Sequence, residues 1–404
     1  MRTLFYAGSL TVAAVLLASD AKAPDSDIAI RPVVPTTNPG PEYSTARRLF
    51  QGIPGIERMA NGRLWATWYS GGKGEGPFNY VLLVSSGDDG KTWSEPRLVV
   101  DPPDPVRAYD PCLWKDPRGR LWWFWAQSAG HWDGRGGVWA MVSEDADREQ
   151  PHWSHPRRIA NGVMMNKPTV LASGDWLLPI AGWRFKTPNV ASTLARNGFT
   201  WGDDVSSRFL HGIGEGDGSA VYASADEGRS FQLRGQARVP ETQYDEHSVV
   251  ERRNGDLWML VRTTSGIGQS VSHDGGRTWS GGGSAGIGQP VTRFFVRRLK
   301  SGNLLLVRNN PPDGKTRSHL TAYLSGDDGV TWMGGLMLDE REQTAYPDGT
   351  QAPNGDVYVI YDRERTAARE ILMAQFAEED VMAGHAVNPR TRLRVIVNRA
   401  GETN

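Results

Sequence analysis

Short apolar segments separated by polar, glycine-containing turns run through most of the 404-residue chain. The clearest example, residues 244–279, has three such segments. An Asn-Gly turn at Asn254 joins the first two, and the third runs into an Asp-Gly-Gly turn at Asp274. Glycine supplies the positive φ that tight hairpin turns require. The pattern therefore predicts a small antiparallel β-meander, because strand-length apolar runs alternate with turn residues.

The meander recurs along the chain. Its first turn appears in six copies, as ANGR from Ala60, DPRGR from Asp116, ASGD from Ala172, RNGD from Arg253, KSGN from Lys300 and PNGD from Pro353. The apolar segments before these turns begin near Ile53, Asp110, Lys167, Glu246, Phe294 and Tyr346, with an insertion at about residues 185–217. A sheet of about fifty residues cannot bury both faces alone. Six such sheets predict an all-β fold, namely a six-bladed β-propeller. A solenoid is disfavoured because the sequence has no strict short repeat.

A second turn has the pattern Ser-x-Asp-x-Gly-x-x-Trp, or an Asp box. It begins at Ser86, Ser224, Ser272 and Ser325, and a degenerate copy begins at Ser143. An aspartate at this position can accept hydrogen bonds from its own turn while glycine takes the left-handed conformation. We therefore predict that these acids are structural and lie away from any active site.

Composition and the chain ends narrow the function class. Residues 1–23 have a basic start and a short apolar core, which is typical of a signal peptide and predicts a periplasmic or secreted protein. Residues 24–46 are expected to form an extended lead-in, residues 47–390 the propeller and residues 391–404 a C-terminal tail. The net charge of −1 gives no general attraction to nucleic acid or membrane. Cys112 is the only cysteine, so we expect neither a disulfide nor a thiolate metal site, and no cofactor.

Polar and charged residues cluster where the inner strands of the predicted propeller begin, which is one mouth of its central channel. The candidates for a site there are Asp110, Lys167, Glu246, His247, Arg293, Tyr346 and Asp348, with Arg262 and Arg317 nearby and His131 in a rim loop. Unpaired buried charge is costly, so a purely structural channel needs few such groups. The set predicts a binding or catalytic pocket, and the alternative is an internal cluster of ion pairs that seals the channel.

These motifs resemble the sialidase (neuraminidase) superfamily over about residues 47–385. Glu246 precedes a Val-Val-Glu strand, Arg262 follows on the next strand, Arg317 precedes a Leu-Thr strand and an Asp box, and Tyr346 opens the last repeat. The resemblance implies that Tyr346 is the nucleophile, that Glu246 removes its proton and that the arginines bind a sugar carboxylate. A tyrosine nucleophile distinguishes sialidases from most glycosidases.

The chain departs from that pattern at two positions. Gly52 stands where the family has the first arginine of its carboxylate-binding triad, and Glu75 is the only acid in the loop that carries the family's acid/base aspartate. Losing one charge-assisted contact should cost about 1.5–3 kcal/mol of carboxylate binding. Glu75, Asp110 and Asp348 are therefore the candidates for the proton donor.

Three functions are consistent with these residues. The first is a secreted exo-glycoside hydrolase that releases a terminal acidic sugar from a glycan or oligosaccharide substrate. The second is a polysaccharide lyase that uses Tyr and His to remove a proton beside a uronate carboxylate, and the third is a propeller that binds glycans without catalysis. The products of the reaction distinguish them, because only a lyase leaves an unsaturated sugar.

Overall fold

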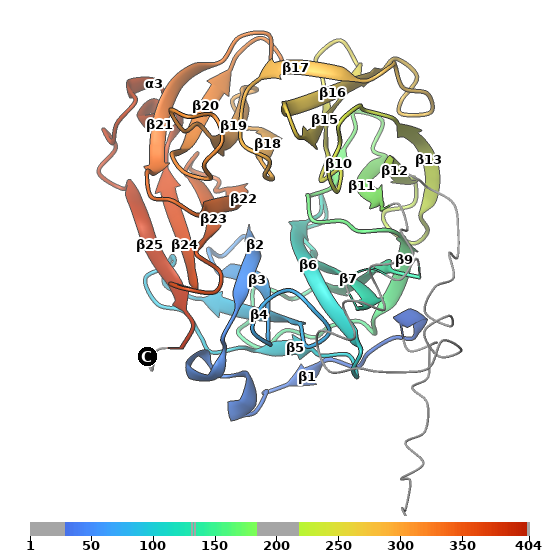
Figure 1. The fold of residues 1–404 in the computed structure, drawn as a ribbon, viewed down its shortest axis with the longest axis vertical. Helices are drawn as coiled ribbons and strands as arrows, with labels where there is room; N and C mark the ends of the chain where they lie inside the picture. Colours follow the sequence, from blue (N-terminus) through green and yellow to red (C-terminus); the bar gives the residue numbers. More distant parts are fainter. Residues whose placement is uncertain (1–28, 131, 133–134, 184–217, 402–404) are drawn as a thin grey trace, which may run out of the picture.

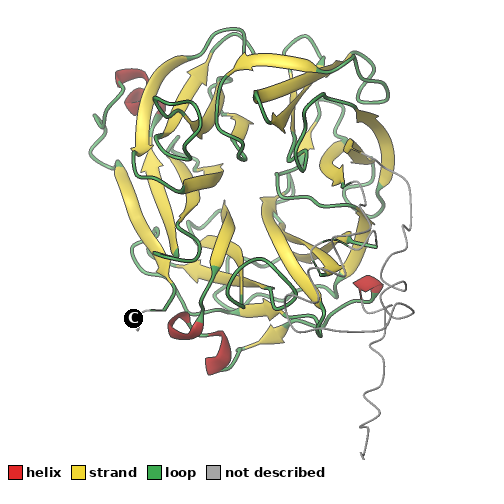
Figure 2. Cartoon of the chain, in the orientation of Figure 1, coloured by secondary structure: helices red, strands yellow, loops and turns green. Residues whose placement is uncertain are grey.

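The computed structural model describes residues 29–130, 132, 135–183 and 218–401. Six antiparallel sheets surround a central axis and confirm the predicted six-bladed propeller (Figure 1). Strands dominate the molecule, and the short helices lie at its periphery (Figure 2). The predicted signal peptide and the insertion at 185–217 lie outside the described residues. None of the described helices is long and apolar enough to cross a membrane.

The chain fills one sheet after another, and five of the six sheets have four strands. The first contains β2 (Gln51–Arg58), β3 (Leu64–Ser70), β4 (Tyr80–Ser86), β5 (Leu98–Val100) and β1 (Thr36–Thr37). The second contains β6 (Val106–Lys115), β7 (Leu121–Ala129), β8 (Gly137–Ser143) and β9 (Arg157–Asn161). The third contains β10 (Thr169–Val170), β11 (Trp176–Gly182), β12 (Gly218–Ser224) and β13 (Gln232–Ala237).

The remaining sheets repeat this order from the axis outward. The fourth contains β14 (Ser248–Glu251), β15 (Leu257–Thr263), β16 (Gly266–Ser272) and β17 (Gly283–Ile287). The fifth contains β18 (Phe295–Arg298), β19 (Leu304–Asn309), β20 (Leu320–Ser325) and β21 (Met333–Asp339). The sixth contains β22 (Thr344–Gln351), β23 (Val357–Arg363), β24 (Glu370–Phe376) and β25 (Arg392–Arg399), and helix α3 (Glu378–Ala383) precedes β25. The inner strands β2, β6, β10, β14, β18 and β22 face the axis (Figure 1).

Both repeated turns have the predicted chemistry. The first turn of every repeat has a glycine with φ between 83° and 97°, at Gly62, Gly119, Gly174, Gly255, Gly302 and Gly355. In the Asp boxes the aspartate binds its own turn: Asp274 accepts hydrogen bonds from the Thr278 backbone N–H at 2.9 Å and hydroxyl at 2.7 Å. The strand registers place the boxes where the inner strands end, away from the mouth. These acids are therefore structural.

The core is divided among the interfaces between sheets. Six buried apolar clusters each lie mainly between two adjacent sheets, and one of them joins the sixth sheet to the first. Tryptophans fill the interface between the second and third sheets, where the rings of Trp114 and Trp176 are 4.7 Å apart edge to face. Each sheet thus buries both faces only when its neighbours are present.

Residues at both ends of the described chain close the ring. Arg48 Nη2 donates to Asn398 Oδ1 at 2.6 Å, and the Gln51 side-chain amide donates to the Arg369 carbonyl at 2.6 Å. Strand β25 is the outer strand of the sixth sheet, so residues expected to form a C-terminal tail belong to the propeller. The expected lead-in likewise contributes β1 and two 3₁₀ helices, η2 (Pro41–Tyr43) and η3 (Thr45–Arg47).

Candidate functional site

Three inner strands, β2, β6 and β22, contain the same distortion, a residue of positive φ followed by proline. Ile53, Asp110 and Tyr346 have φ of 53°, 47° and 57°. At each one the inner strand holds one more residue than its partner, which defines a β-bulge. Left-handed backbone is strained in bulky residues such as Ile53 and Tyr346, and such strain is typical of functional sites. The bulges direct these side chains differently from the regular alternation of β2, β6 and β22.

A second strained segment positions Glu246 just before β14. Tyr244, Asp245 and Glu246 all have positive φ, at 63°, 58° and 42°. The Asn166 side-chain amide holds this segment by donating to the carbonyls of Glu246 and His247, both at 2.9 Å. The folded protein stabilises a backbone that these residues rarely adopt, and it thereby fixes the direction of the Glu246 carboxylate.

Glu246, Arg262 and Tyr346 meet although they lie on or beside strands of two different sheets. The Tyr346 hydroxyl donates to Glu246 Oε1 at 2.9 Å, and Arg262 Nη1 donates to that oxygen at 2.6 Å and to the hydroxyl at 2.8 Å. All three residues are at least 95% buried. Burial raises the pKa of the Tyr346 phenol above its ordinary value, and the negative charge of Glu246 raises it further. The nearby arginines lower this pKa but do not cancel the rise. The phenol therefore needs an adjacent base to ionise, and Glu246 is in contact with it.

Two further arginines lie over the Tyr346 ring. The Cζ atoms of Arg317 and Arg365 are 5.7 Å and 4.2 Å from its centroid. Both arginines line a pocket of about 390 Å³ with Gln343, Ala345, Asp362, Glu364, Thr366 and Ala367. A pocket of this size suits a small molecule. Sequence reasoning placed Arg317 here but missed Arg365, which belongs to the loop between β23 and β24.

Asp110 lies close enough to this cluster to respond to its charges. Burial raises the pKa of the Asp110 carboxyl from 3.8 to about 7, while Arg107 opposes the rise and Glu75 and Glu246 increase it. Asp110 is 3% exposed. Such a group keeps its proton near neutral pH and can donate it, as a general acid must.

The structure places three of the expected substrate-binding residues elsewhere. Lys167 Nζ lies 3.2 Å from both Glu57 and Asp348 and donates to the Ile56 carbonyl at 2.7 Å. Arg293 Nη2 lies 3.6 Å from Asp348, and neither side chain is more than 1% exposed. Lys167, Arg293 and Asp348 thus belong to a buried ion cluster that joins inner strands, which was the structural alternative for these residues.

One of the two expected histidines, His247, is held within the fold. His247 is 1% exposed, and its Nε2 pairs with the Ala220 carbonyl at 2.7 Å. Burial lowers the pKa of His247 to about 4, so the ring is neutral and held within the fold. His131 lies outside the described residues.

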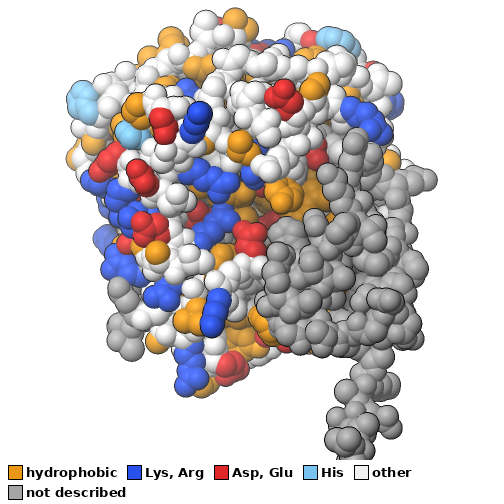
Figure 3. Space-filling view, in the orientation of Figure 1, with side chains coloured by type: hydrophobic (Ala, Val, Ile, Leu, Met, Phe, Trp, Pro, Cys, Tyr) orange, Lys and Arg blue, Asp and Glu red, His pale blue; other side chains and the backbone are white. Residues whose placement is uncertain are grey.

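An aromatic wall borders the cluster on the side of Arg262. It consists of Trp183 and three rings around it, those of Tyr109, Trp132 and Tyr244, whose centroids lie 5.1–6.1 Å from the centroid of Trp183. Tyr244 is 43% exposed, and its ring lies 5.6 Å from the Arg262 Cζ. Figure 3 shows basic and acidic side chains beside a hydrophobic area near the middle of one face. An exposed aromatic face such as that of Tyr244 can pack against a sugar ring. From sequence, only the position of Trp132, Trp183 and Tyr244 in loops between strands could have indicated these residues.

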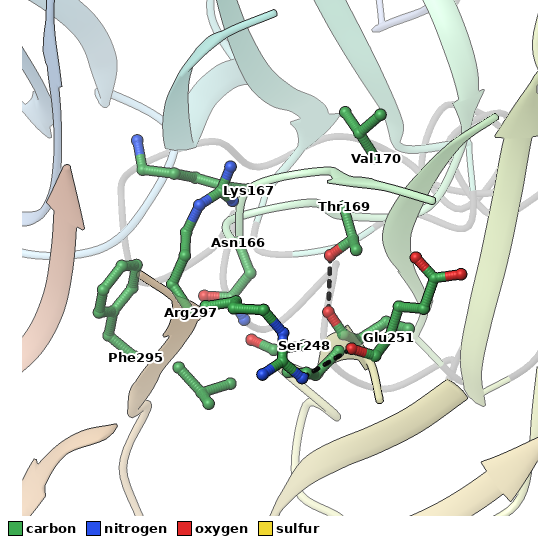
Figure 4. Close-up of a pocket in the computed structure, with 12 residues that line it drawn as sticks. Asn166, Lys167, Thr169, Val170, Ser248, Glu251, Phe295 and Arg297 are labelled. Carbon is green, nitrogen blue, oxygen red and sulfur yellow. Dashed lines mark hydrogen bonds between the residues drawn. The ribbon is translucent and has the colours of Figure 1, made fainter. Parts of the chain in front are cut away.

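A second cavity of about 230 Å³ lies between β10, β14 and β18 (Figure 4). Its lining includes Lys167, Glu251 and Arg297, but none of the residues around Tyr346. Thr169 and Arg298 already donate hydrogen bonds to backbone carbonyls within it, at 2.6 Å and 2.9 Å.

Among the described residues, no group of three or more His, Cys, Asp or Glu side chains could hold a metal ion. The Tyr346 cluster is therefore the candidate active site.

Sequence comparison places the fold within a known family. Residues 62–359 match the BNR repeat-like domain family. The chain belongs to that family. A sialidase of Bacteroides fragilis is 23% identical over 312 residues, which cover 70% of this chain and 54% of the relative. A sialidase of Vibrio cholerae is 28% identical over 167 residues, 35% of this chain and 21% of the relative. This BNR-repeat chain thus spans about half or less of these relatives.

Solved structures show the same fold. The intramolecular trans-sialidase of Ruminococcus gnavus superimposes with a TM-score of 0.61 at 14% identity, covering 87% of this chain and 99% of that one. A protein of unknown function from Dyadobacter fermentans gives a TM-score of 0.57 at 19% identity, covering 83% and 95%. The propeller is therefore sialidase-like in architecture, and the chemistry has to be argued from its own residues.

Proposed function

We propose that the protein is a secreted or periplasmic glycoside hydrolase that releases a terminal acidic sugar from glycans. The observation that carries the proposal is the 2.9 Å hydrogen bond from the buried Tyr346 hydroxyl to Glu246, with Arg262 on both groups. In covalent catalysis the nucleophile is usually hydrogen-bonded to a base, and a third group orients that base. The sialidases named among its relatives support the same class of reaction.

The first chemical step transfers the sugar to the enzyme. Glu246 takes the phenolic proton, and the Tyr346 oxygen forms a bond to the anomeric carbon as the glycosidic bond breaks. Asp110 gives its proton to the leaving oxygen. Arg262 stabilises the charge that develops on the phenol oxygen, since its Nη1 lies 2.8 Å away.

The second step releases the sugar. The Asp110 carboxylate takes a proton from water, whose oxygen attacks the anomeric carbon. The Tyr346 oxygen leaves as phenolate and regains the proton held by Glu246. One water is consumed, and every side chain returns to its starting state, as a two-step retaining mechanism requires.

The surrounding charge favours an acidic sugar. Arg262, Arg317 and the pocket beside them present guanidinium groups, which bind carboxylates through paired hydrogen bonds. A tyrosine nucleophile also suits such a substrate, because a carboxylate nucleophile would be repelled by the sugar's own charge. Among the described residues the lyase alternative has less support, since His247 is buried and its Nε2 pairs with the Ala220 carbonyl.

The test is turnover of a substrate panel by purified protein. Sialyl-lactose, aryl sialosides and aryl glucuronides should be compared between the wild type, Tyr346→Phe and Glu246→Gln. We expect at least one acidic glycoside to be hydrolysed, and Glu246→Gln to lower kcat about 10²–10⁴-fold. A fluorinated acidic sugar should also leave a covalent adduct on Tyr346, detectable by peptide mass spectrometry.

A control tyrosine lies in the same sheet. Tyr358 donates to Asp89 at 2.6 Å at the Asp-box end of the propeller, so Tyr358→Phe also loses a bond to a carboxylate but should keep its turnover. An unsaturated, ultraviolet-absorbing product would show a lyase instead. Binding of acidic glycans without any turnover would show a binding propeller.

The role of Asp110 has its own test. Asp110→Asn should slow the hydrolysis of natural glycosides about 10²–10⁴-fold but spare aryl glycosides whose leaving groups need no proton. With natural substrates, wild-type activity should fall above pH 7, because the pKa of about 7 leaves the carboxyl unprotonated there. If both substrate types lose activity equally, Asp110 is not the proton donor, and Glu75→Gln should then show the selective loss.

A further inference from the structure

Gly52 leaves a space at the start of β2 that a side chain from another sheet occupies. A Cβ atom added at Gly52 would lie 2.6 Å, 2.7 Å and 2.9 Å from the Cδ, Nε and Cγ atoms of Arg365. Real Cβ contacts are not this short, so no larger residue fits at position 52 while Arg365 keeps its place. The glycine and the arginine are therefore complementary across the junction of the first and sixth sheets.

The side chain of Arg365 is fixed by contacts on both sides of that junction. Its Nε donates to Asp362 Oδ2 at 2.9 Å, and the same carboxylate oxygen accepts the Ile53 backbone N–H at 2.8 Å. Its Nη1 donates to Glu75 Oε1 at 2.9 Å. Asp362 is 1% exposed, so it is a rigid support, whereas the Glu75 side chain is 37% exposed.

The guanidinium that results lies beside the proposed nucleophile. Its Cζ is 4.2 Å from the Tyr346 ring centroid, and Arg317, which lines the same pocket, is 5.7 Å from that centroid. The Nη2 of Arg365 makes no hydrogen bond to any residue that the structure describes. An enclosed donor without a partner is unfavourable, and an anion at this position would satisfy it.

We propose that Arg365 supplies the third guanidinium of the anion site, from the loop between β23 and β24, in the space that Gly52 leaves. With Arg262 and Arg317 it surrounds Tyr346 and recognises the carboxylate of the sugar. This assignment rests on the proposed function. It means that the positive charge absent from position 52 is supplied from position 365 instead. The expected ligand is therefore a sugar acid held by three guanidinium groups.

The experiment measures binding of acids and their methyl esters. The probes are 2,3-dehydro-N-acetylneuraminic acid and glucuronic acid, each beside its methyl ester, titrated calorimetrically into wild type, Arg365→Ala and Arg365→Lys. For an acid that binds the wild type, Arg365→Ala should weaken binding about ten- to hundred-fold, as expected for one charge-assisted contact. Ester binding should change less than three-fold, and Arg365→Lys should fall between the wild type and Arg365→Ala. Arg363→Ala, which loses two carboxylate contacts in the same loop region, should behave like the wild type.

A relocation variant tests whether positions 52 and 365 are equivalent. Gly52→Arg combined with Arg365→Ala should recover acid binding to within a few-fold of the wild type. If the folded double variant binds no better than Arg365→Ala, or if Arg365→Ala weakens acid and ester equally, the assignment is overturned. A wild type that binds none of the four probes would overturn the proposed function and this assignment with it. A wild type whose acid binding is unchanged by Arg365→Ala would overturn this assignment alone.

Discussion

Replacing Asp110 with asparagine should change how the stability of the protein depends on pH. Asp110 is 3% exposed, and burial raises the pKa of its carboxyl to about 7 from the ordinary 3.8. Asparagine has nearly the same shape but cannot ionise. The substitution therefore removes one titration and little volume.

The sign follows from which state binds the proton. Between pH 5 and pH 7 the folded protein keeps the Asp110 proton, while the unfolded chain has lost it. Raising the pH through this window must therefore lower the free energy of unfolding of the wild type. The slope is about 1.36 kcal/mol per pH unit well below the folded pKa and about half of that at it, so the loss from pH 5 to pH 7 is roughly 2 kcal/mol, which Asp110→Asn should not show.

The measurement is urea unfolding at pH 5, 6, 7 and 8, followed by tryptophan fluorescence. The quantity of interest is the difference in the free energy of unfolding between Asp110→Asn and the wild type, which should grow by about 2 kcal/mol from pH 5 to pH 7 and then level off by pH 8. Asp88→Asn is the control, because hydrogen bonds within its turn lower the pKa of Asp88 to about 2, below this window. A difference for Asp110→Asn that stays constant across the four pH values would refute the buried, protonated carboxyl.

Three further predictions concern supporting residues. Asn166→Ala should lower kcat with little change in KM, because the Glu246 and His247 carbonyls lose their donor and the Glu246 carboxylate loses its fixed direction. An unfolding curve of the same variant distinguishes this loss of kcat from a loss of stability. Lys167→Ala should destabilise the protein by about 3–5 kcal/mol in denaturant unfolding, because it leaves Asp348 buried beside an empty site. Asp274→Asn should lower Tm but leave kcat of the folded enzyme unchanged, since the hydrogen bonds that this acid makes with described residues lie within its own turn.

The sequence alone determined the architecture of this protein. Turn chemistry and the alternation of apolar segments are local properties, so six glycine turns and the Asp boxes could be counted before any contact was known. The motifs around Glu246, Arg262, Arg317 and Tyr346 also identified residues that the structure brings around one phenol. The local sequence pattern was sufficient to identify these residues because each motif marks a fixed position within its own repeat.

Only the tertiary structure decided which charged residues face the pocket. Lys167 precedes β10 and Asp348 lies on β22, where the sequence predicted site residues as it did for Asp110 and Tyr346, yet Lys167 and Asp348 pair with each other in a buried ion cluster. Bulges of one residue change where a side chain points, and they depend on pairing across strands as well as on local sequence. Arg365 was hidden for a related reason: it meets Gly52 only because the ring closes between the sixth sheet and the first. The sequence specified the repeats, and the closure of the ring decided the composition of the site.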